Sequence, residues 1–106
     1  MTDVNFTKKK LFFIAEIGSN FNQSYELGKK LILNAKNIGA NAVKFQIFKA
    51  SKLYPKDKKM YKIFKKIELS QKQFIYFKKF ADKINIPITC SAFDIESAKF
   101  LEKCNV

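Results

Sequence analysis

The alternation of short apolar runs with longer amphipathic segments is the feature that most restricts the fold of this chain. Apolar runs of strand length lie at residues 11–17, 42–48 and 88–92, and a segment with helical periodicity follows each of them. A β-α-β-α-β-α order predicts parallel strands joined by right-handed crossovers. Three such units suit a flavodoxin-like sheet or part of a (β/α)8 barrel, whose complete form needs about 250 residues.

Helix signals support this order. The first helix is predicted at 24–38, the second from Ser70 and the third after its cap, Asp94. Ser70 and Gln73 form a capping-box pattern, and Gly39 stands where a C-terminal cap belongs. The residues expected to face the core are Gly28, Leu31, Ile32, Ala35 and Ile38 in the first helix, Phe74, Phe77, Ala81 and Ile84 in the second, and Ala98 and Leu101 in the third.

Two segments depart from the regular alternation. Residues 1–10 read as a basic N-terminal tail, and residues 11–106 read as one domain. Residues 49–69 are rich in lysine and contain Pro55, with a short helix expected near residues 60–66. This is a long connection after a strand, and such connections often carry function.

The charge and the missing residue types narrow the classes of function. The net charge is +12, yet all 21 basic residues are lysine, and histidine is absent. Bidentate recognition of phosphate or guanine favours arginine, so we expect a solvated lysine surface, compatible with attraction of small anions, and no nucleic-acid partner. Cys90 and Cys104 lack a metal-binding spacing. No apolar run approaches the ~20 residues of a membrane span, and no signal peptide is recognisable, so we predict a cytoplasmic protein without a membrane partner.

Polar residues recur near the carboxyl ends of the three predicted strands. In the second strand, Lys44 and Gln46 share one face, opposite the apolar residues. Glu16 and Ser91 hold comparable positions in the first and third strands, which in a barrel is the mouth where active sites form. A lysine and a hydroxyl suit a phosphate or carboxylate, and a carboxylate and an amide suit sugar hydroxyls. Two structural alternatives stay open: Glu16 and Lys44 merely neutralise each other, or Asn20, in the first loop, only forms a turn.

Three sequence stretches resemble the N-terminal part of the sialic acid synthases. They are A-E-I-G-S-N at residues 15–20, G-A-N-A-V-K-F-Q at 39–46 and S-A-F-D-I-E-S at 91–97. The I-E-L-S at 67–70 and the F-L-E-K at 100–103 are also similar, so the resemblance covers about residues 11–106. This family includes the N-acetylneuraminate, legionaminate and pseudaminate synthases.

The resemblance implies a fold and a reaction. Family members use a (β/α)8 barrel followed by a small antifreeze-like domain. They condense phosphoenolpyruvate with an N-acylated amino sugar, and a divalent metal such as manganese or magnesium polarises the sugar aldehyde. Carbon C3 of phosphoenolpyruvate attacks that aldehyde, water adds at C2, and phosphate leaves after C–O cleavage.

The resemblance also implies roles for single residues. Lys44 matches the lysine that binds the phosphoenolpyruvate anion, and Ser91 matches a hydroxyl position beside it. Gln46 and Glu16 match positions that face the amino sugar, with Glu16 as the predicted catalytic residue. Asn20 matches the asparagine of an N-H-x-G loop that also serves substrate binding. Three residues depart from the family pattern: Phe21 replaces the histidine of that loop, Gln23 replaces its glycine, and Ala92 replaces the proline of S-T-P-F.

We therefore expect the first three βα units of a TIM barrel. The metal ligands and the second domain of the family lie beyond this stretch, which suggests a fragment, a truncated frame or one piece of a split enzyme. We expect the isolated chain to be inactive and to need the remainder of the barrel or a homodimer partner. The alternatives are a different phosphoenolpyruvate-condensing barrel, an aldolase that forms a Schiff base on Lys44, a lysine-rich nucleic-acid-binding module, and a small flavodoxin-like domain.

Overall fold

Three parallel strands form one sheet, in the order β1-β2-β3, and helices alternate with them. This computed structural model describes residues 11–106, and the predicted basic tail at 1–10 lies outside the described residues. The elements are β1 (Ile14–Gly18), α1 (Tyr25–Asn37), β2 (Ala42–Ile47), α2 (Ala50–Leu53), α3 (Lys59–Lys65), α4 (Gln71–Lys83), β3 (Ile88–Ala92) and α5 (Ile95–Lys103). The expected α/β alternation with parallel strands is confirmed.

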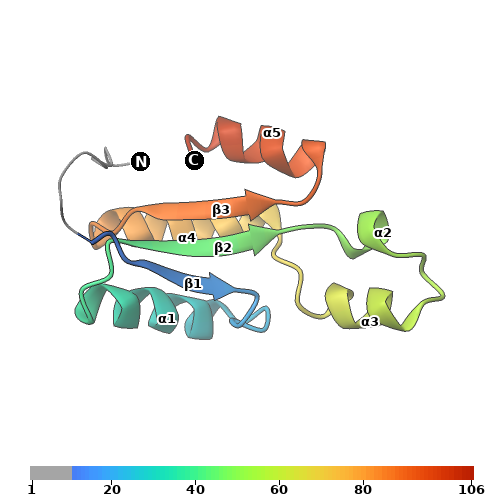
Figure 1. The fold of residues 1–106 in the computed structure, drawn as a ribbon, viewed down its shortest axis with the longest axis horizontal. Coiled ribbons are helices and arrows are strands. Elements are labelled where there is room, and N and C mark those ends of the chain that lie inside the picture. The colour runs from blue at the N-terminus through green and yellow to red at the C-terminus, as the bar shows by residue number, and fades with distance from the viewer. Residues whose placement is uncertain (1–10) are drawn as a thin grey trace.

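The helices cover one face of the sheet and leave the other face open. Helix α1 packs against β1 and β2, α4 packs against β3, and the two helices contact each other. In Figure 1 the sheet lies in front of α4, and no helix of residues 11–106 crosses the face turned toward the viewer. Helices α2 and α3 project beyond the carboxyl end of β2 (Figure 1). The sheet therefore presents its strand ends and one whole face to solvent.

The predicted helix caps form as the sequence indicates. The Ser70 hydroxyl accepts a hydrogen bond from the Gln73 N–H at 3.0 Å, while the Gln73 side chain accepts one from the Ser70 N–H at 3.4 Å. Asp94 caps α5 through the Ser97 N–H at 2.7 Å. Gly39 has a φ of +90°, as a C-terminal cap requires. These bonds satisfy backbone groups that the ends of a helix otherwise leave unpaired.

An aromatic cluster fills the space between the sheet and its helices. The rings of Phe45 on β2 and Phe77 on α4 are stacked, with centroids 5.1 Å apart and an interplanar angle of 10°. Phe21 meets both rings edge-on, and all three side chains are fully buried. Gly28 lets α1 approach this cluster, because a Cβ atom there would lie only 2.3 Å from Cζ of Phe77. Position 28 therefore has to be glycine for the two helices to pack as they do.

Some residues predicted to be buried are exposed. The run at 11–17 was expected to be a buried strand, but β1 starts at Ile14, and Leu11 is 81% exposed. Ile38 is 82% exposed, since it follows the last turn of α1 and lies about 80° around the helix from Gly28. In α5 the buried face runs through Ser97 and Leu101, so the prediction that Ala98 faces inward is wrong. The four-residue helix α2 was not predicted.

Candidate functional site

The open face of the sheet carries the polar residues that the sequence singled out. Val43, Phe45 and Ile47 of β2 are buried against the helices. Strand side chains alternate, so Lys44 and Gln46 lie on the opposite face, and both are half-buried. Residues Glu16, Thr89 and Ser91 share this phase in the neighbouring strands. The predicted alternation of faces is therefore present.

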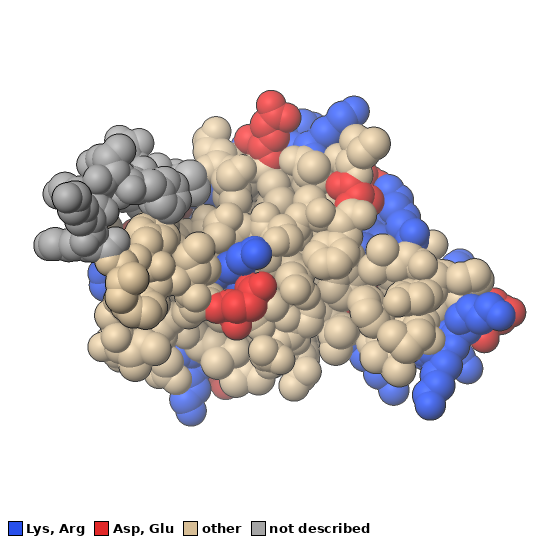
Figure 2. Space-filling model, in the orientation of Figure 1, with Lys and Arg blue, Asp and Glu red and all other residues tan. Residues whose placement is uncertain are grey.

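Strand register brings these side chains into two rows. Glu16, Lys44 and Thr89 are partners across β1, β2 and β3, and Gln46 is the partner of Ser91 one step closer to the carboxyl end. The Glu16 Oε1 and Lys44 Nζ atoms are 3.9 Å apart, and their side chains are 48% and 37% exposed. Figure 2 shows acidic and basic atoms adjoining each other in the middle of a mostly uncharged face. An exposed pair at this distance contributes little to stability, so Lys44 remains available to an anion.

The end of β1 lies beside the Gln46 side chain. Gly18 has a φ of +58°, and the register between β1 and β2 shifts between Glu16 and Gly18. A Cβ atom at Gly18 would lie 3.7 Å from Cδ of Gln46, which places the Gln46 amide beside this glycine. A left-handed backbone favours glycine, so the bend that ends β1 depends on Gly18, whereas a Cβ atom there would make only an ordinary contact with Gln46.

Asn20 lies in the loop after β1, apart from the two rows. Its side chain is exposed, and its N–H donates to the Ile17 carbonyl at 3.0 Å. Among residues 11–106, its side chain makes no hydrogen bond with Glu16, Lys44, Gln46 or Ser91. The structure thus brings four of the five predicted site residues together on the open face and leaves Asn20 on the rim. Thr89, which the sequence analysis did not select, also lies on the open face. It could have been found from the sequence, because it is two residues from Ser91 and therefore lies on the same face of the strand.

Cys90 lies between these positions in sequence but points to the helix side of β3. It packs against the core, and burial together with the nearby Glu16 carboxylate raises the pKa of its thiol from 9.0 to about 12. The Lys44 ammonium acts in the opposite direction and is the weaker influence. A thiol with so high a pKa is protonated at neutral pH, so Cys90 acts here as an apolar core residue and not as a nucleophile.

A divalent cation finds no complete set of ligands in this part of the molecule. Within residues 11–106, no three or more His, Cys, Asp or Glu side chains gather in one place. The open face offers one carboxylate, Glu16, and this carboxylate already faces the Lys44 ammonium. Mg²⁺ and Mn²⁺ prefer several oxygen ligands, so residues 11–106 do not form a site for either ion by themselves. The same residues contain no helix that is long and apolar enough to cross a membrane.

Comparisons with known proteins identify the family of this chain. Residues 31–106 match the NeuB family. The chain belongs to the NeuB family. It is 35% identical over 104 residues to the N,N'-diacetyllegionaminic acid synthase of Legionella pneumophila, with 85% of this chain and 29% of that protein covered. An uncharacterized protein of Methanocaldococcus jannaschii is 38% identical over 95 residues, which cover 90% of this chain and 28% of that protein.

A solved structure extends this NeuB-family relationship to the fold. The N-acetylneuraminic acid synthetase of Leptospira borgpetersenii, crystallised in complex with citrate, superposes with a TM-score of 0.85 at 29% identity. The match covers 91% of this chain and 34% of that chain. The chain thus spans about a third of the length of its relatives, and the expected likeness to the N-terminal part of a sialic acid synthase barrel is confirmed.

The loop after β1 explains two departures from the pattern of the family. Phe21, at the position where the resemblance expects histidine, is fully buried against Phe45 and Phe77 and does not reach the open face. Gln23, at the expected glycine position, has a φ of +58°, which a glycine would adopt without strain. Its side chain Nε2 donates to the carbonyls of Lys65 and Glu68 at 3.0 and 3.1 Å. The glutamine therefore gains contacts that glycine lacks.

These contacts belong to a polar network that connects the loop to the segment between β2 and α4. The buried Gln73 donates from Nε2 to the Gln23 carbonyl at 2.8 Å. The Glu68 carboxylate accepts from the Ala50 N–H at 3.0 Å, at the start of α2, and from Lys65 Nζ at 2.8 Å. Gln23 and Glu68 together hold the first loop of this NeuB-family chain against residues 49–69.

Replacing Gln23 with glycine should loosen this connection without much change in overall stability. The substitution removes two hydrogen bonds of about 1 kcal/mol each, but it also relieves a left-handed conformation that costs a similar amount. We expect amide hydrogen exchange in residues 64–69 to rise about fivefold or more, with a nearly unchanged Tm. The control is Asn22→Gly, because Asn22 has a φ of +49° and no side-chain hydrogen bond within residues 11–106. Unchanged exchange in residues 64–69 of the Gln23→Gly variant would show that the bridge does not hold this segment.

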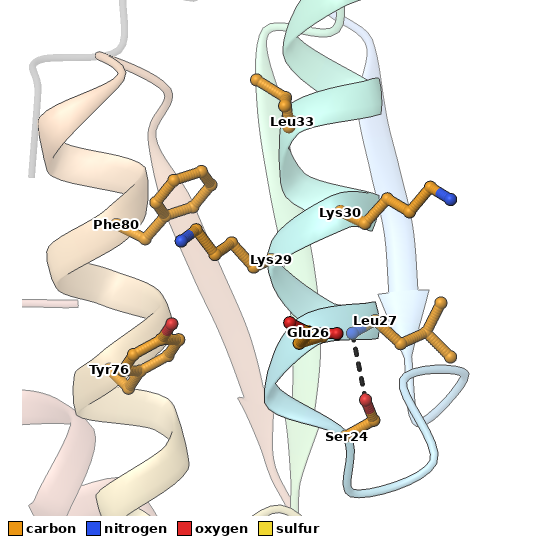
Figure 3. A pocket seen from close by; sticks show the side chains of 8 residues that line it. All are labelled: Ser24, Glu26, Leu27, Lys29, Lys30, Leu33, Tyr76 and Phe80. Atoms are coloured by element: carbon orange, nitrogen blue, oxygen red, sulfur yellow. Dashed lines mark hydrogen bonds between the residues drawn. The ribbon is translucent and has the colours of Figure 1, made fainter.

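A hollow on the helix layer is a poorer candidate for the site. It has a volume of about 570 Å³ and lies between α1 and α4, away from the open face (Figure 3). Two of its polar groups have partners, since Ser24 Oγ accepts from the Leu27 N–H at 3.1 Å and Lys29 Nζ lies 5.1 Å from the centre of the Phe80 ring. The Lys30 side chain extends away from Tyr76 and Phe80 (Figure 3). These interactions stabilise the helix pair, so the hollow offers no set of converging free groups comparable to the open face.

Proposed function

We propose that this chain is part of a synthase that condenses phosphoenolpyruvate with an N-acylated amino sugar, yielding a nonulosonic acid and phosphate. One observation carries the proposal: Glu16, Lys44, Gln46 and Ser91 share the open face of the sheet, in a chain of the NeuB family. Two relatives, a legionaminic acid synthase and a sialic acid synthetase, support the same class of product.

In this proposal the part of the open face formed by β2 and β3 binds the phosphoenolpyruvate anion. Lys44 supplies the positive charge, and an ammonium group binds phosphate or carboxylate as a point charge. The Thr89 hydroxyl is the register partner of Lys44, and Ser91 is two residues further along the same strand. Both hydroxyls can donate to an oxyanion. Lys44 and the two hydroxyls therefore offer donors of the kind that a phosphorylated enol requires.

In this proposal the amino sugar binds to the groups beside β1. Gln46 provides an amide and Glu16 a carboxylate, the pair of groups that recognises hydroxyls, and Asn20 on the adjoining loop adds a second amide. Glu16 is the proposed catalytic residue, because it is the carboxylate on the open face of residues 11–106 that lies beside Lys44. It can accept a proton or a hydrogen bond from a sugar hydroxyl during bond formation.

The proposal includes groups from outside residues 11–106. A divalent cation would polarise the sugar aldehyde as a Lewis acid, with ligands that these residues do not supply. Residues 11–106 also do not supply the groups that would lie opposite the open face of the sheet. These groups would come from the remainder of a barrel or from a homodimer partner. The proposed location of the synthase is the cytoplasm.

The test is product formation by the complete reading frame that contains these residues. The protein is incubated with manganese, phosphoenolpyruvate labelled with ¹⁸O at the bridging oxygen, and a panel of N-acylated amino sugars that includes N-acetylmannosamine. We expect a nonulosonic acid by mass spectrometry and the label in the released phosphate, because the C–O bond breaks. Label retained in the sugar acid would mean P–O cleavage and would contradict the proposed reaction. Imine trapping by borohydride on Lys44 would instead support an aldolase that forms a Schiff base.

A further inference from the structure

The lysines of this chain are concentrated in one short segment. Residues 49–66, which we name the lysine segment, contain eight lysines and one aspartate, a net charge of +7. The remaining residues of 11–106 contain ten lysines and seven acidic residues, a net charge of only +3. A general compositional preference for lysine does not explain this difference, because it would spread the charge along the chain.

The fold places the lysine segment at the carboxyl ends of all three strands. It begins two residues after β2 and projects beyond that strand (Figure 1). Gln23 connects it to the loop after β1 through the Lys65 carbonyl. Lys52 connects it to the start of α5, with its Nζ atom 2.6 Å from Glu96 and 3.9 Å from Asp94. The segment therefore borders the same end of the sheet as Gln46 and Ser91.

Most of the positive charge in this segment is not neutralised. Lys52 and Lys65 form ion pairs with carboxylates, whereas the other six lysines of the segment, all exposed, form none within residues 11–106. Four of these six, Lys56, Lys58, Lys59 and Lys62, lie in the middle of the segment. Figure 2 shows basic side chains crowding this end of the molecule. Charges of one sign beside a site raise the local concentration of oppositely charged ligands over a Debye length, about 10 Å at 0.1 M salt.

The aromatic residues of the lysine segment favour a small anion over a nucleic acid. Proteins that bind single strands present aromatic rings on which bases stack. Here the rings of Tyr54 and Phe64 pack on each other with centroids 5.2 Å apart, and Phe64 also packs on Phe48. Because these rings pack on one another, they are less available for stacking on bases. Arginine, which binds phosphate and guanine in a bidentate manner, is absent from the chain.

We propose that the lysine segment is an electrostatic collector that concentrates phosphoenolpyruvate at the mouth of the site. The inference rests on the proposed function and assigns a separate task to residues that do not contact the substrate. Lys44 binds the anion directly, whereas the lysine segment changes how often the anion reaches Lys44. Its contribution therefore depends on salt much more strongly than the contribution of Lys44.

The experiment compares two fourfold variants of the complete reading frame. The first replaces Lys56, Lys58, Lys59 and Lys62 with glutamine. The control replaces Lys30, Lys79, Lys83 and Lys103, which lie on helices of the outer layer and form no ion pair within residues 11–106. Both variants lose the same charge, so any difference between them comes from the position of the lysines. The dissociation constant of phosphoenolpyruvate is measured by titration calorimetry, alongside kcat and KM.

At an ionic strength of about 20 mM, we expect the first variant to bind phosphoenolpyruvate about three- to tenfold more weakly, with kcat unchanged. At about 300 mM the difference should fall below about twofold, because salt screens exposed charges. An unchanged dissociation constant at low salt, or an equal loss in the control, would overturn the collector. Loss of RNA binding in the first variant, with unchanged phosphoenolpyruvate binding, would also overturn the collector.

These results also separate the collector from the proposed function. If phosphoenolpyruvate binds in a lysine-dependent manner but no sugar acid forms, the collector stands and the synthase assignment fails. If sugar acid forms and the lysine segment makes no difference, the synthase stands and the collector fails. If phosphoenolpyruvate neither binds nor reacts, both are wrong.

Discussion

Replacing Lys44 with glutamine should lower kcat/KM for phosphoenolpyruvate by about 10²- to 10³-fold. Lys44 is the lysine on the open face of residues 11–106, and its Nζ atom lies 3.9 Å from Glu16. Glutamine keeps most of the length and the hydrogen-bonding ability but removes the charge. The anion then loses a charge-assisted hydrogen bond and meets the Glu16 carboxylate without a compensating ammonium. Together these effects cost about 3 to 4 kcal/mol, and about 1.4 kcal/mol corresponds to a tenfold change.

Two control variants make this result specific. Lys30→Gln removes the same charge from the outer surface of α1, and we expect less than a twofold change. Lys44→Arg keeps the charge but replaces a compact ammonium by a larger planar group, so a partial loss is expected. The assay is steady-state kinetics of the complete reading frame with phosphoenolpyruvate as the varied substrate. A loss below about threefold in Lys44→Gln would contradict the role assigned to this lysine.

Truncating Phe77 to alanine should have the largest effect on stability, about 3 to 5 kcal/mol. The ring is fully buried, stacks on Phe45 and receives the edge of Phe21. Its loss opens a cavity that connects α4 to β2 and to the loop after β1. The measurement is chemical denaturation followed by circular dichroism, and a cost below about 1 kcal/mol would show that this cluster does not hold the sheet and helices together.

Gly28 provides a second variant that tests the same packing from α1. Alanine normally stabilises a helix by about 1 kcal/mol relative to glycine. At position 28 its Cβ would lie 2.3 Å from Cζ of Phe77, whose ring is fully buried and stacked on Phe45. We therefore expect Gly28→Ala to destabilise the protein by about 1 to 3 kcal/mol.

The double variant separates this contact from a general loss of packing. Once Phe77 is alanine, the clash disappears, so adding Gly28→Ala should be neutral or stabilising. A sign reversal of this kind is measured by a double-mutant cycle. Additive destabilisation by the two substitutions would mean that Gly28 is required for a reason other than the ring of Phe77.

Local sequence signals were sufficient for the order of the elements and for the faces of the strands. The capping box of Ser70 and Gln73 and the left-handed Gly39 are decided by residues close in sequence. The alternation of Val43, Lys44, Phe45 and Gln46 follows from strand geometry, which made the polar face of β2 predictable. For this reason Lys44 and Gln46 could be assigned to one face before the fold was known.

Features that depend on contacts distant in sequence were not predictable. Leu11 and Ile38 look like core residues, but their burial depends on where β1 begins and where α1 ends. The bridge from Gln23 to Lys65 and Glu68 spans more than forty residues, and no local pattern indicates it. The register that aligns Thr89 with Lys44 also requires the paired strands, although the phase of Thr89 was visible in the sequence.

The role proposed for the lysines also depends on contacts between residues distant in sequence. From the sequence, residues 49–69 were already rich in lysine, and a solvated lysine surface was the simplest interpretation. The fold groups the lysine segment beside the strand ends that carry Gln46 and Ser91, and this position suggests a task for charges that contact nothing. The charge count of the segment did not show that its lysines lie beside these strand ends.

The central claim, that the open face binds the phosphoenolpyruvate anion through Lys44, is tested most directly by lysine footprinting. The complete reading frame is acylated briefly with and without saturating phosphoenolpyruvate, and the labelling rate of each lysine is read by mass spectrometry. We expect phosphoenolpyruvate to slow the labelling of Lys44 about tenfold or more, since an occupied site blocks its Nζ atom, while Lys30 and Lys103 keep their rates. Equal labelling of Lys44 in both conditions, in a protein that binds phosphoenolpyruvate, would place the anion elsewhere and contradict the account.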